Sequence, residues 1–204
     1  MKKLEKGRFI VFEGIDGSGK TMQLTRTAQW LENSEYTVTA LREPSDGQWG
    51  REIRSIVSGK LPPVSPEKEL DLFVHDRQDN ISRNIKPALQ AGNIVLQDRY
   101  FYSTLAYQGA RGFELKYIEQ LHKPFIIYPD LLLIFDIDPA KGLERIASLR
   151  KSDLSIFERI DFLQKVKLIY DSFGGDFVIH IKADKSPEIV EAEVRDAIMS
   201  LLRS

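Results

Sequence analysis

The stretch GRFIVFEGIDGSGKTMQL, residues 7–24, constrains this chain more than any other part of its sequence. An apolar run ends at Phe12, and the eight residues after Glu13 fit the pattern G-x-x-x-x-G-K-[ST]. That pattern requires a buried strand before it and an amphipathic helix after it, and the flanking residues favour both. Glycines let successive backbone N–H groups curl around a phosphate, and the helix N-terminus adds positive potential. The stretch therefore predicts a nucleoside triphosphate site.

Within this loop, two side chains carry specific chemistry. Lys20 can reach the β- and γ-phosphates, and the Thr21 hydroxyl can ligate Mg²⁺. We expect a nucleoside triphosphate and Mg²⁺ as the ligands of this loop. The residues predicted to bind the nucleotide are Gly14, Ile15, Asp16, Gly17, Ser18, Gly19, Lys20 and Thr21.

The rest of the chain alternates between strand-like and helix-like segments. Short, almost continuously apolar runs predict buried strands over residues 9–12, 37–41, 94–96, 131–135 and 177–181. Helical periodicity predicts helices over residues 22–31, 67–91, 139–148, 157–170 and 187–202. Alternation of this kind is typical of an α/β fold, with a five-stranded parallel sheet and helices on both faces. With no linker or repeat, residues 1–204 are predicted to form one domain.

Composition narrows the possible partners. The 204 residues carry a net charge of −1, so no general field attracts nucleic acid or an anionic membrane, and neither is expected as a partner. The chain has no cysteine, which excludes disulfide scaffolds and thiolate metal sites. The basic N-terminal residues precede no apolar signal core, and the next apolar run is too short to span a bilayer. These features predict a cytoplasmic protein.

The phosphate-binding loop alone leaves several protein classes open. GTPases usually carry the base-reading motif N-K-x-D, which this chain lacks, and repair ATPases would be expected to show a basic surface or further domains. A small-molecule kinase needs a second pocket for the phosphate acceptor and a mobile basic lid. A nucleotide-binding switch without an acceptor pocket is the alternative from another class.

Candidate residues for an acceptor pocket follow two of the predicted strands. Asp98 and Arg99 end one strand, and Arg42 and Glu43 end another. Ligands of open parallel sheets bind outside the C-terminal ends of the strands, so these groups are expected near the phosphate-binding loop. In the long helix over 67–91, Phe73 is four residues before Arg77, which puts them on one face where they could stack a base and bond its edge.

The motifs FEGIDGSGKT, REP, LFxxDR, DRYxxSxxAYQG and PDLLxxxDxDP resemble, in order and spacing, those of the thymidylate kinase family. The resemblance extends from residue 9 to about residue 170. It implies a P-loop nucleotide-kinase fold and an enzyme, a phosphotransferase that makes dTDP from dTMP and ATP with Mg²⁺. It also implies a homodimer. A kinase for another nucleoside monophosphate, such as dUMP or UMP, is the closest alternative.

The resemblance also implies roles for single residues. Lys20, Asp16 and Arg99 would act in catalysis, and Thr21 and Asp98 would hold the metal. Asp16 and Glu13 would lie beside the acceptor sugar and phosphate. Substrate binding would involve Glu13, Arg42, Phe73, Arg77, Arg99, Thr104 and Tyr107. Of these, Arg42 and Arg99 would hold the phosphate, and Tyr107 would crowd the sugar 2′ position. Phe73 would stack the thymine, while Arg77 and Thr104 would bond its edge.

Three departures from the family pattern bear on these roles. Met22 replaces a frequent Thr or Ser, EPSDGQWG replaces an EPGGT-like loop, and Tyr102 occupies a position that is often acidic. The predicted lid, residues 146–156, has few arginines. Because the phosphate-binding loop supplies only Lys20 as a side-chain cation, we expect Arg150 in the lid to act in catalysis, with Arg145 and Lys151 as the next candidates.

Overall fold

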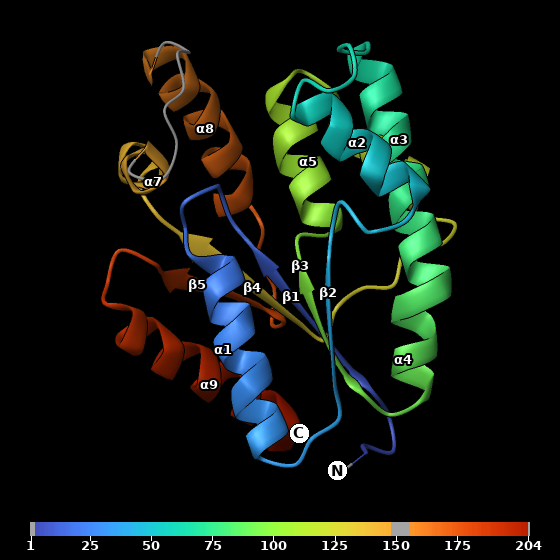
Figure 1. Ribbon diagram of the computed structural model, residues 1–204. Helices are drawn as coiled ribbons and strands as arrows, with labels where there is room; N and C mark the ends of the chain where they lie inside the picture. The colour runs from blue at the N-terminus through green and yellow to red at the C-terminus, as the bar shows by residue number, and fades with distance from the viewer. Residues whose placement is uncertain (1–2, 148–155, 204) are drawn as a thin grey trace.

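The computed structural model describes residues 3–147 and 156–203. Its centre is a five-stranded parallel sheet with strand order β2-β3-β1-β4-β5 (Figure 1). The predicted α/β fold and parallel sheet are confirmed, with strand ends shifted by one or two residues. The strands are β1 (Arg8–Glu13), β2 (Val38–Arg42), β3 (Ile94–Asp98), β4 (Leu131–Asp136) and β5 (Val178–Lys182).

Burial separates the three inner strands from the two edge strands. Nearly every residue of β1, β3 and β4 is buried, which explains their unbroken apolar sequences, whereas β2 and β5 are partly exposed. β1 pairs with β3 on one side and with β4 on the other, so the chain order reverses beside it. Such a switch point opens a crevice at the C-terminal ends of the strands. The phosphate-binding loop leaves β1 at this crevice.

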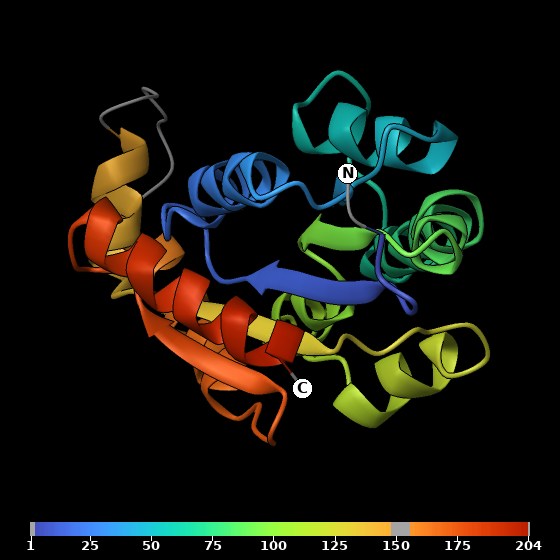
Figure 2. The same cartoon turned by 90° about the horizontal axis from the view of Figure 1, so that it is seen from below.

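Helices cover both faces of the sheet. α1 (Lys20–Asn33) packs against α9 (Pro187–Arg203) on one face, as Figure 2 shows from below. On the other face, α5 (Phe101–Ala110) contacts α3 (Pro66–Asn80), α6 (Leu115–His122) and α8 (Ile156–Asp171). The remaining helices are α2 (Gln48–Val57), α4 (Lys86–Gln90) and α7 (Pro139–Ala147). None of the helices in the described ranges has the length and apolar character needed to cross a membrane.

The helix predicted over residues 67–91 is interrupted. α3 begins one residue before the predicted range, with Ser65 as its N-cap and Pro66 in its first turn. A π-helical turn, η1 (Ile81–Ile85), then separates α3 from α4. Pro87 has no N–H to donate to the preceding turn, which favours a wider hydrogen-bond spacing there. The helical periodicity of residues 67–91 identifies the segment as helical but does not reveal the π-helical turn.

Candidate active site

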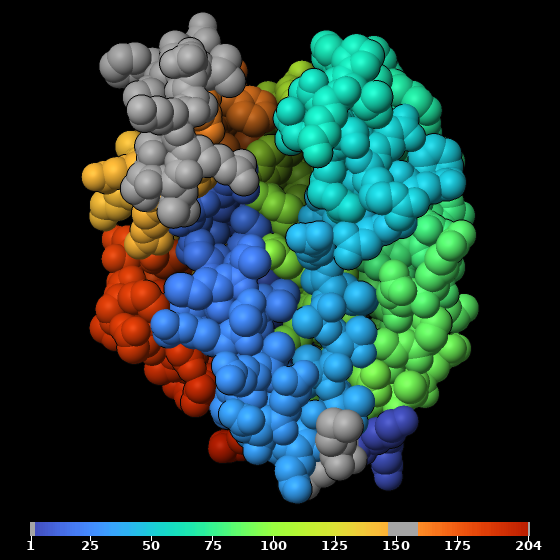
Figure 3. All heavy atoms as spheres, viewed as in Figure 1, coloured from blue at the N-terminus to red at the C-terminus, as the bar shows by residue number. Residues whose placement is uncertain are grey.

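A cavity of about 350 Å³ opens at the C-terminal ends of the inner strands. In Figure 3 it belongs to a groove between the phosphate-binding loop and α8 on one side and α2 and α3 on the other, with α5 at its floor. Seven of the residues predicted from the sequence line the cavity: Asp16, Glu43, Phe73, Arg77, Arg99, Thr104 and Tyr107. The fold therefore brings together residues that span 91 positions of the chain, from Asp16 to Tyr107.

The phosphate-binding loop has the backbone shape that its glycines predict. Gly14, Gly17 and Gly19 have positive φ angles of 141°, 82° and 85°. A Cβ on Gly17 would come within 2.1 Å of the Gly142 carbonyl oxygen on α7, so that position also requires glycine for space. Gly19, the N-cap of α1, offers no side chain to bond the first N–H groups of the helix. Those groups are therefore left for an anion.

Lys20 begins α1 and is buried. Its Nζ lies 3.4 Å from the Ile15 carbonyl oxygen and 3.8 Å from an Asp16 carboxylate oxygen. Burial and the nearby charge of Arg99 together lower the pKa of Lys20 to about 8, although Asp16 opposes both. With such weak protein contacts, this ammonium needs an anionic ligand to compensate for its lost hydration.

Thr21 and Asp98 form a pair suited to Mg²⁺. The Thr21 hydroxyl donates a 2.5 Å hydrogen bond to Asp98 Oδ2, while the buried Oδ1 of Asp98 has no hydrogen-bond partner among the described residues. A hydroxyl and a carboxylate with a free oxygen fit an ion that is otherwise held by substrate phosphates and water. No group of three or more His, Cys, Asp or Glu in the described ranges is arranged to hold a metal alone.

Arg99 lies where the phosphate-binding loop meets the cavity. Its guanidinium donates to Asp16 Oδ1 through Nη2 and to Ser103 Oγ through Nη1, the latter at 3.1 Å. Its Cζ also lies 5.2 Å from the centre of the Tyr107 ring. Burial would raise the pKa of Asp16, but the charges of Arg99 and Lys20 keep it below the ordinary value. Asp16 is therefore an ionised acceptor at this corner.

Glu13, predicted to lie beside the acceptor sugar, is completely buried and does not line the cavity. Its carboxylate accepts hydrogen bonds from the backbone N–H groups of Tyr100 and Ser103, at 2.7 and 3.0 Å. The hydroxyls of Ser103 and Tyr170 also donate to it, at 2.6 and 2.9 Å. Burial raises the pKa of Glu13, and these donors oppose the rise. Glu13 thus caps the start of α5.

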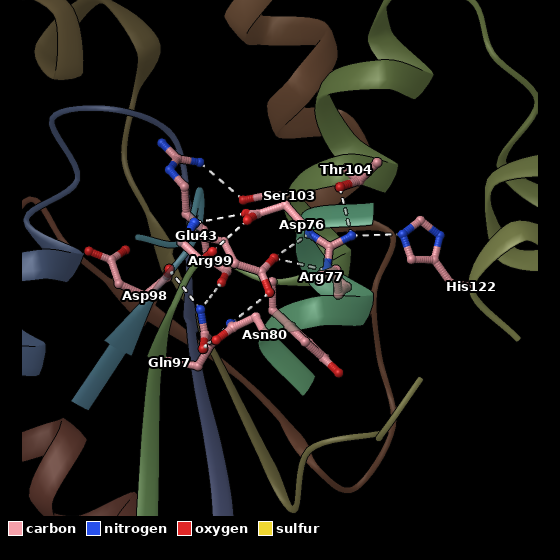
Figure 4. A network of polar contacts seen from close by, with 12 residues as sticks. Glu43, Asp76, Arg77, Asn80, Gln97, Asp98, Arg99, Ser103, Thr104 and His122 are labelled. Carbon is pink, nitrogen blue, oxygen red and sulfur yellow. Dashed lines mark hydrogen bonds and ion pairs between the residues drawn. The ribbon is translucent and has the colours of Figure 1, made fainter. Parts of the chain in front are cut away.

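The far end of the cavity is built around Arg77 (Figure 4). Nε and Nη2 of Arg77 both donate to Glu43, at 2.9 and 2.6 Å, and Nη1 donates to Thr104 Oγ1 at 2.9 Å. Nη1 also lies 2.8 Å from Nε2 of His122, whose Nδ1 lies 2.7 Å from the Ile118 carbonyl oxygen. Since only a donor can face that carbonyl, Nδ1 carries the proton and Nε2 accepts from Arg77. Four of the five N–H groups of Arg77 are therefore engaged.

Two buried groups beside Arg77 have shifted pKa values. Burial lowers the pKa of His122 to about 3, and the positive charge of Arg77 acts in the same direction. The imidazole is neutral and serves as a hydrogen-bond acceptor. Burial raises the pKa of Glu43 to about 7, while Arg77 opposes the rise. The forked hydrogen bonds from Arg77 favour the ionised carboxylate.

Arg42 lies apart from the cavity. Its Nη2 bonds Asp46 at 3.0 Å, and 63% of its side chain is exposed. It is not among the described residues that line the cavity. Arg150 and Lys151 fall outside the described residues, as do all lid positions from 148 to 155. Arg145 reaches back from α7 to the carbonyl oxygens of Gly17 and Ala183, at 3.3 and 3.1 Å.

The cavity also contains residues that sequence reasoning missed. Gln108 is four residues after Thr104 on α5, and its buried carbonyl oxygen has no hydrogen-bond partner in the described part of the chain. The same i, i+4 spacing that paired Phe73 with Arg77 could have identified it. Arg54, on the unpredicted helix α2, lines the cavity and donates to the Pro44 and Ser45 carbonyl oxygens at 2.6 and 2.5 Å. No sequence signal pointed to Arg54 or to His122.

Comparison with known proteins agrees with this geometry. A family model described as thymidylate kinase matches residues 12–194. The chain is 38% identical over 193 residues to a probable thymidylate kinase of Archaeoglobus fulgidus, which covers 95% of each chain. It is 38% identical to a thymidylate kinase of Desulfotalea psychrophila, and the alignment covers 97% of this chain and 96% of that relative. It is 40% identical to a thymidylate kinase of Akkermansia muciniphila, and the alignment covers 95% of this chain and 92% of that relative. The chain that carries this phosphate-binding loop and cavity thus belongs to the thymidylate kinase family.

Proposed function

We propose that this enzyme transfers the γ-phosphoryl group of ATP to dTMP, giving ADP and dTDP for nucleotide biosynthesis. The observation that carries the proposal is that the ATP-binding loop and the acceptor cavity meet at the same residues. Asp16 belongs to the phosphate-binding loop, yet it lines the acceptor cavity and bonds Arg99 there. A phosphate held by Arg99 would face the γ-phosphate held by Lys20.

The reaction proceeds by positioning and charge neutralisation, without a covalent enzyme intermediate. A phosphate oxygen of dTMP forms the new P–O bond as the bond from the γ-phosphorus to the ADP oxygen breaks. Lys20 and Arg99 stabilise the charge that spreads over the transferred group. Thr21 and Asp98 would hold Mg²⁺, which supplies neutralising charge at the ATP phosphates. Asp16 keeps Arg99 oriented and accepts a hydrogen bond from the acceptor sugar.

The other end of the cavity reads the base. Phe73 lines the wall and would stack the thymine. Because Arg77 donates to Thr104 Oγ1, the Thr104 hydroxyl hydrogen remains free to donate to the O4 carbonyl. The Gln108 carbonyl oxygen, which has no hydrogen-bond partner within residues 3–147 and 156–203, is suited to accept from the N3–H group. Tyr107, placed beside Arg99 between the base and phosphate ends, would crowd a ribose 2′-hydroxyl.

The test is an ADP-release assay with ATP, Mg²⁺ and five acceptors: dTMP, dUMP, UMP, ribothymidylate and dCMP. We expect dTMP to have the highest kcat/KM, ribothymidylate to lose efficiency through the 2′-hydroxyl, and dCMP to react poorly because its N3 and N4 invert the donor and acceptor pattern. The highest efficiency with dUMP or UMP would reassign the substrate. ATP binding without transfer to any acceptor would favour the nucleotide-binding switch.

Three further expectations belong to the proposal. We expect a single domain over residues 1–204 whose lid, residues 146–156, closes over ATP and brings Arg150 to the transferred phosphoryl group. We also expect a homodimer, which light scattering coupled to size-exclusion chromatography would measure. Finally, we expect the enzyme to act in the cytoplasm, without nucleic acid or membrane partners.

A further inference from the structure

The backbone of Arg99 has an unusual conformation for its residue type. Its φ angle is 62°, in the left-handed region that side chains other than glycine rarely adopt. This conformation turns the chain from the end of β3 into α5, and it directs the guanidinium towards Asp16 and Ser103. Such a conformation persists only where its surroundings hold it, so the groups that bond the two flanking peptides determine where the guanidinium lies.

All four polar groups of those two peptides are bonded. On the first peptide, the Arg99 N–H donates to the Phe12 carbonyl oxygen at 3.0 Å, and the Asp98 carbonyl oxygen accepts from the Glu43 N–H at 2.9 Å. On the second, the Tyr100 N–H donates to Glu13 at 2.7 Å. The remaining group, the Arg99 carbonyl oxygen, accepts from Nε2 of Gln97 at 2.8 Å. The Gln97 amide also reaches the Asp98 carbonyl oxygen at 3.3 Å, so it contacts both peptides.

The orientation of the Gln97 amide is itself determined by its neighbours (Figure 4). Asn80 donates through Nδ2 to Glu43 Oε1 at 3.1 Å and to Gln97 Oε1 at 3.3 Å. A carboxylate and a backbone carbonyl both require donors, so neither amide can be reversed without losing its partners. Asn84, in the π-helical turn, donates to Asn80 Oδ1 at 2.9 Å and secures the other end. Gln97 is therefore a rigid clamp with 0% of its surface exposed.

From this geometry we propose that Gln97 is a positioning residue for phosphoryl transfer. It is not among the described residues that line the cavity, and it acts by holding the peptides of Arg99 so that the guanidinium meets the acceptor phosphate. The inference rests on the proposed function of Arg99. Because a displacement of about 1 Å can lower a rate by about 10²-fold, loss of this clamp is expected to affect turnover more than binding of ATP.

The test compares Gln97→Met with Gln23→Met. Both glutamines are buried, with 0% and 1% exposed surface, and both donate to a backbone carbonyl oxygen; the partner of Gln23 is Pro187, at 2.9 Å. The substitution keeps side-chain length and removes the donor. We expect Gln97→Met to lower kcat by about tenfold or more with the KM for ATP nearly unchanged. Gln23→Met should lower only Tm. Should Gln97→Met fail to fold, Gln97→Asn, whose amide is one methylene too short, is measured instead.

A double-mutant cycle separates positioning from general damage. In an Arg99→Gly background, where the guanidinium is absent, adding Gln97→Met should lower kcat no further. The inference would be overturned if Gln97→Met lowered kcat in the Arg99→Gly background as much as it does in the wild type. It would also be overturned if the Gln97 and Gln23 variants had equal kcat at a similar fall in Tm. These outcomes require a wild-type enzyme that phosphorylates dTMP, so inactive wild-type protein would instead count against the proposed function.

Discussion

The two ends of the site treat charge in opposite ways: the phosphate end is the phosphate-binding loop with Asp98, and the base end is the part of the cavity around Arg77. At the phosphate end, the α1 N-terminus, the Lys20 ammonium and one Asp98 oxygen lack strong protein partners among the described residues. At the base end, Arg77, Glu43 and His122 are paired with one another and buried. The difference indicates that the polar groups of the phosphate end find their partners only when the ligands bind. The base end, by contrast, is a binding site whose polar groups are already paired within the protein.

The largest expected effect concerns the base end. Arg77→Met leaves the Glu43 carboxylate buried without its ion-pair partner, and we expect the free energy of unfolding to fall by about 3–5 kcal/mol, measured by urea denaturation. The double variant Arg77→Met/Glu43→Gln removes the uncompensated charge and should regain most of this loss. A single variant as stable as the wild type would show that the paired charges do not hold this region together.

Next in size is the effect of removing Lys20 at the phosphate end. Lys20→Ala should lower kcat by about 10²–10³-fold, because it removes a cation that stabilises the transferred phosphoryl group. The fold should remain intact, with a Tm equal to or above that of the wild type, since a buried ammonium with weak partners is lost. Turnover close to wild type would contradict the ATP site, and a marked fall in Tm would contradict the contrast between the two ends.

The smallest effect is a pH dependence of Lys20. Its pKa is lowered from 10.5 to about 8, so between these values the folded protein binds fewer protons at Lys20 than the unfolded chain does. Burial of the ammonium therefore costs stability below pH 8, and this cost is relieved as the pH rises towards 10.5. ATP binding needs the ammonium, so kcat/KM for ATP should fall about tenfold per pH unit above pH 8. Lys20→Arg, with a guanidinium that stays charged, should show no such fall in the same titration.

The placement of residues at the phosphate end follows from the sequence, and the reason is local. One continuous motif places Lys20 and Thr21, and the parallel sheet brings Asp98 and Arg99 to the same edge. The five strands were predictable because buried strands of a parallel sheet are almost continuously apolar. The helices α2 and α6 were not predicted although their sequences are amphipathic, because with ten and eight residues they repeat the helical period too few times to stand out from a loop. The π-helical turn does not change the helical period visibly either.

The base end was predicted only in part, because its network joins residues from four separate elements. Arg77 and Thr104 were expected to bond the base directly, yet Arg77 donates most of its N–H groups to the protein. His122 comes from α6 and had no spacing that linked it to the others. Glu13, expected beside the sugar, is buried inside the fold, where its carboxylate caps α5. Such contacts depend on tertiary packing, which no sequence period encodes.

The cap of α5 has a consequence for how the protein folds. The acceptor for the first N–H groups of this helix lies on β1, 87 residues earlier than Tyr100 and 90 earlier than Ser103. A contact over that distance forms only after a large loop has closed, here when β1 and β3 align. The floor of the cavity should therefore gain its amide-exchange protection together with the central strands, and a folding chain would acquire its nucleotide pocket as one cooperative unit.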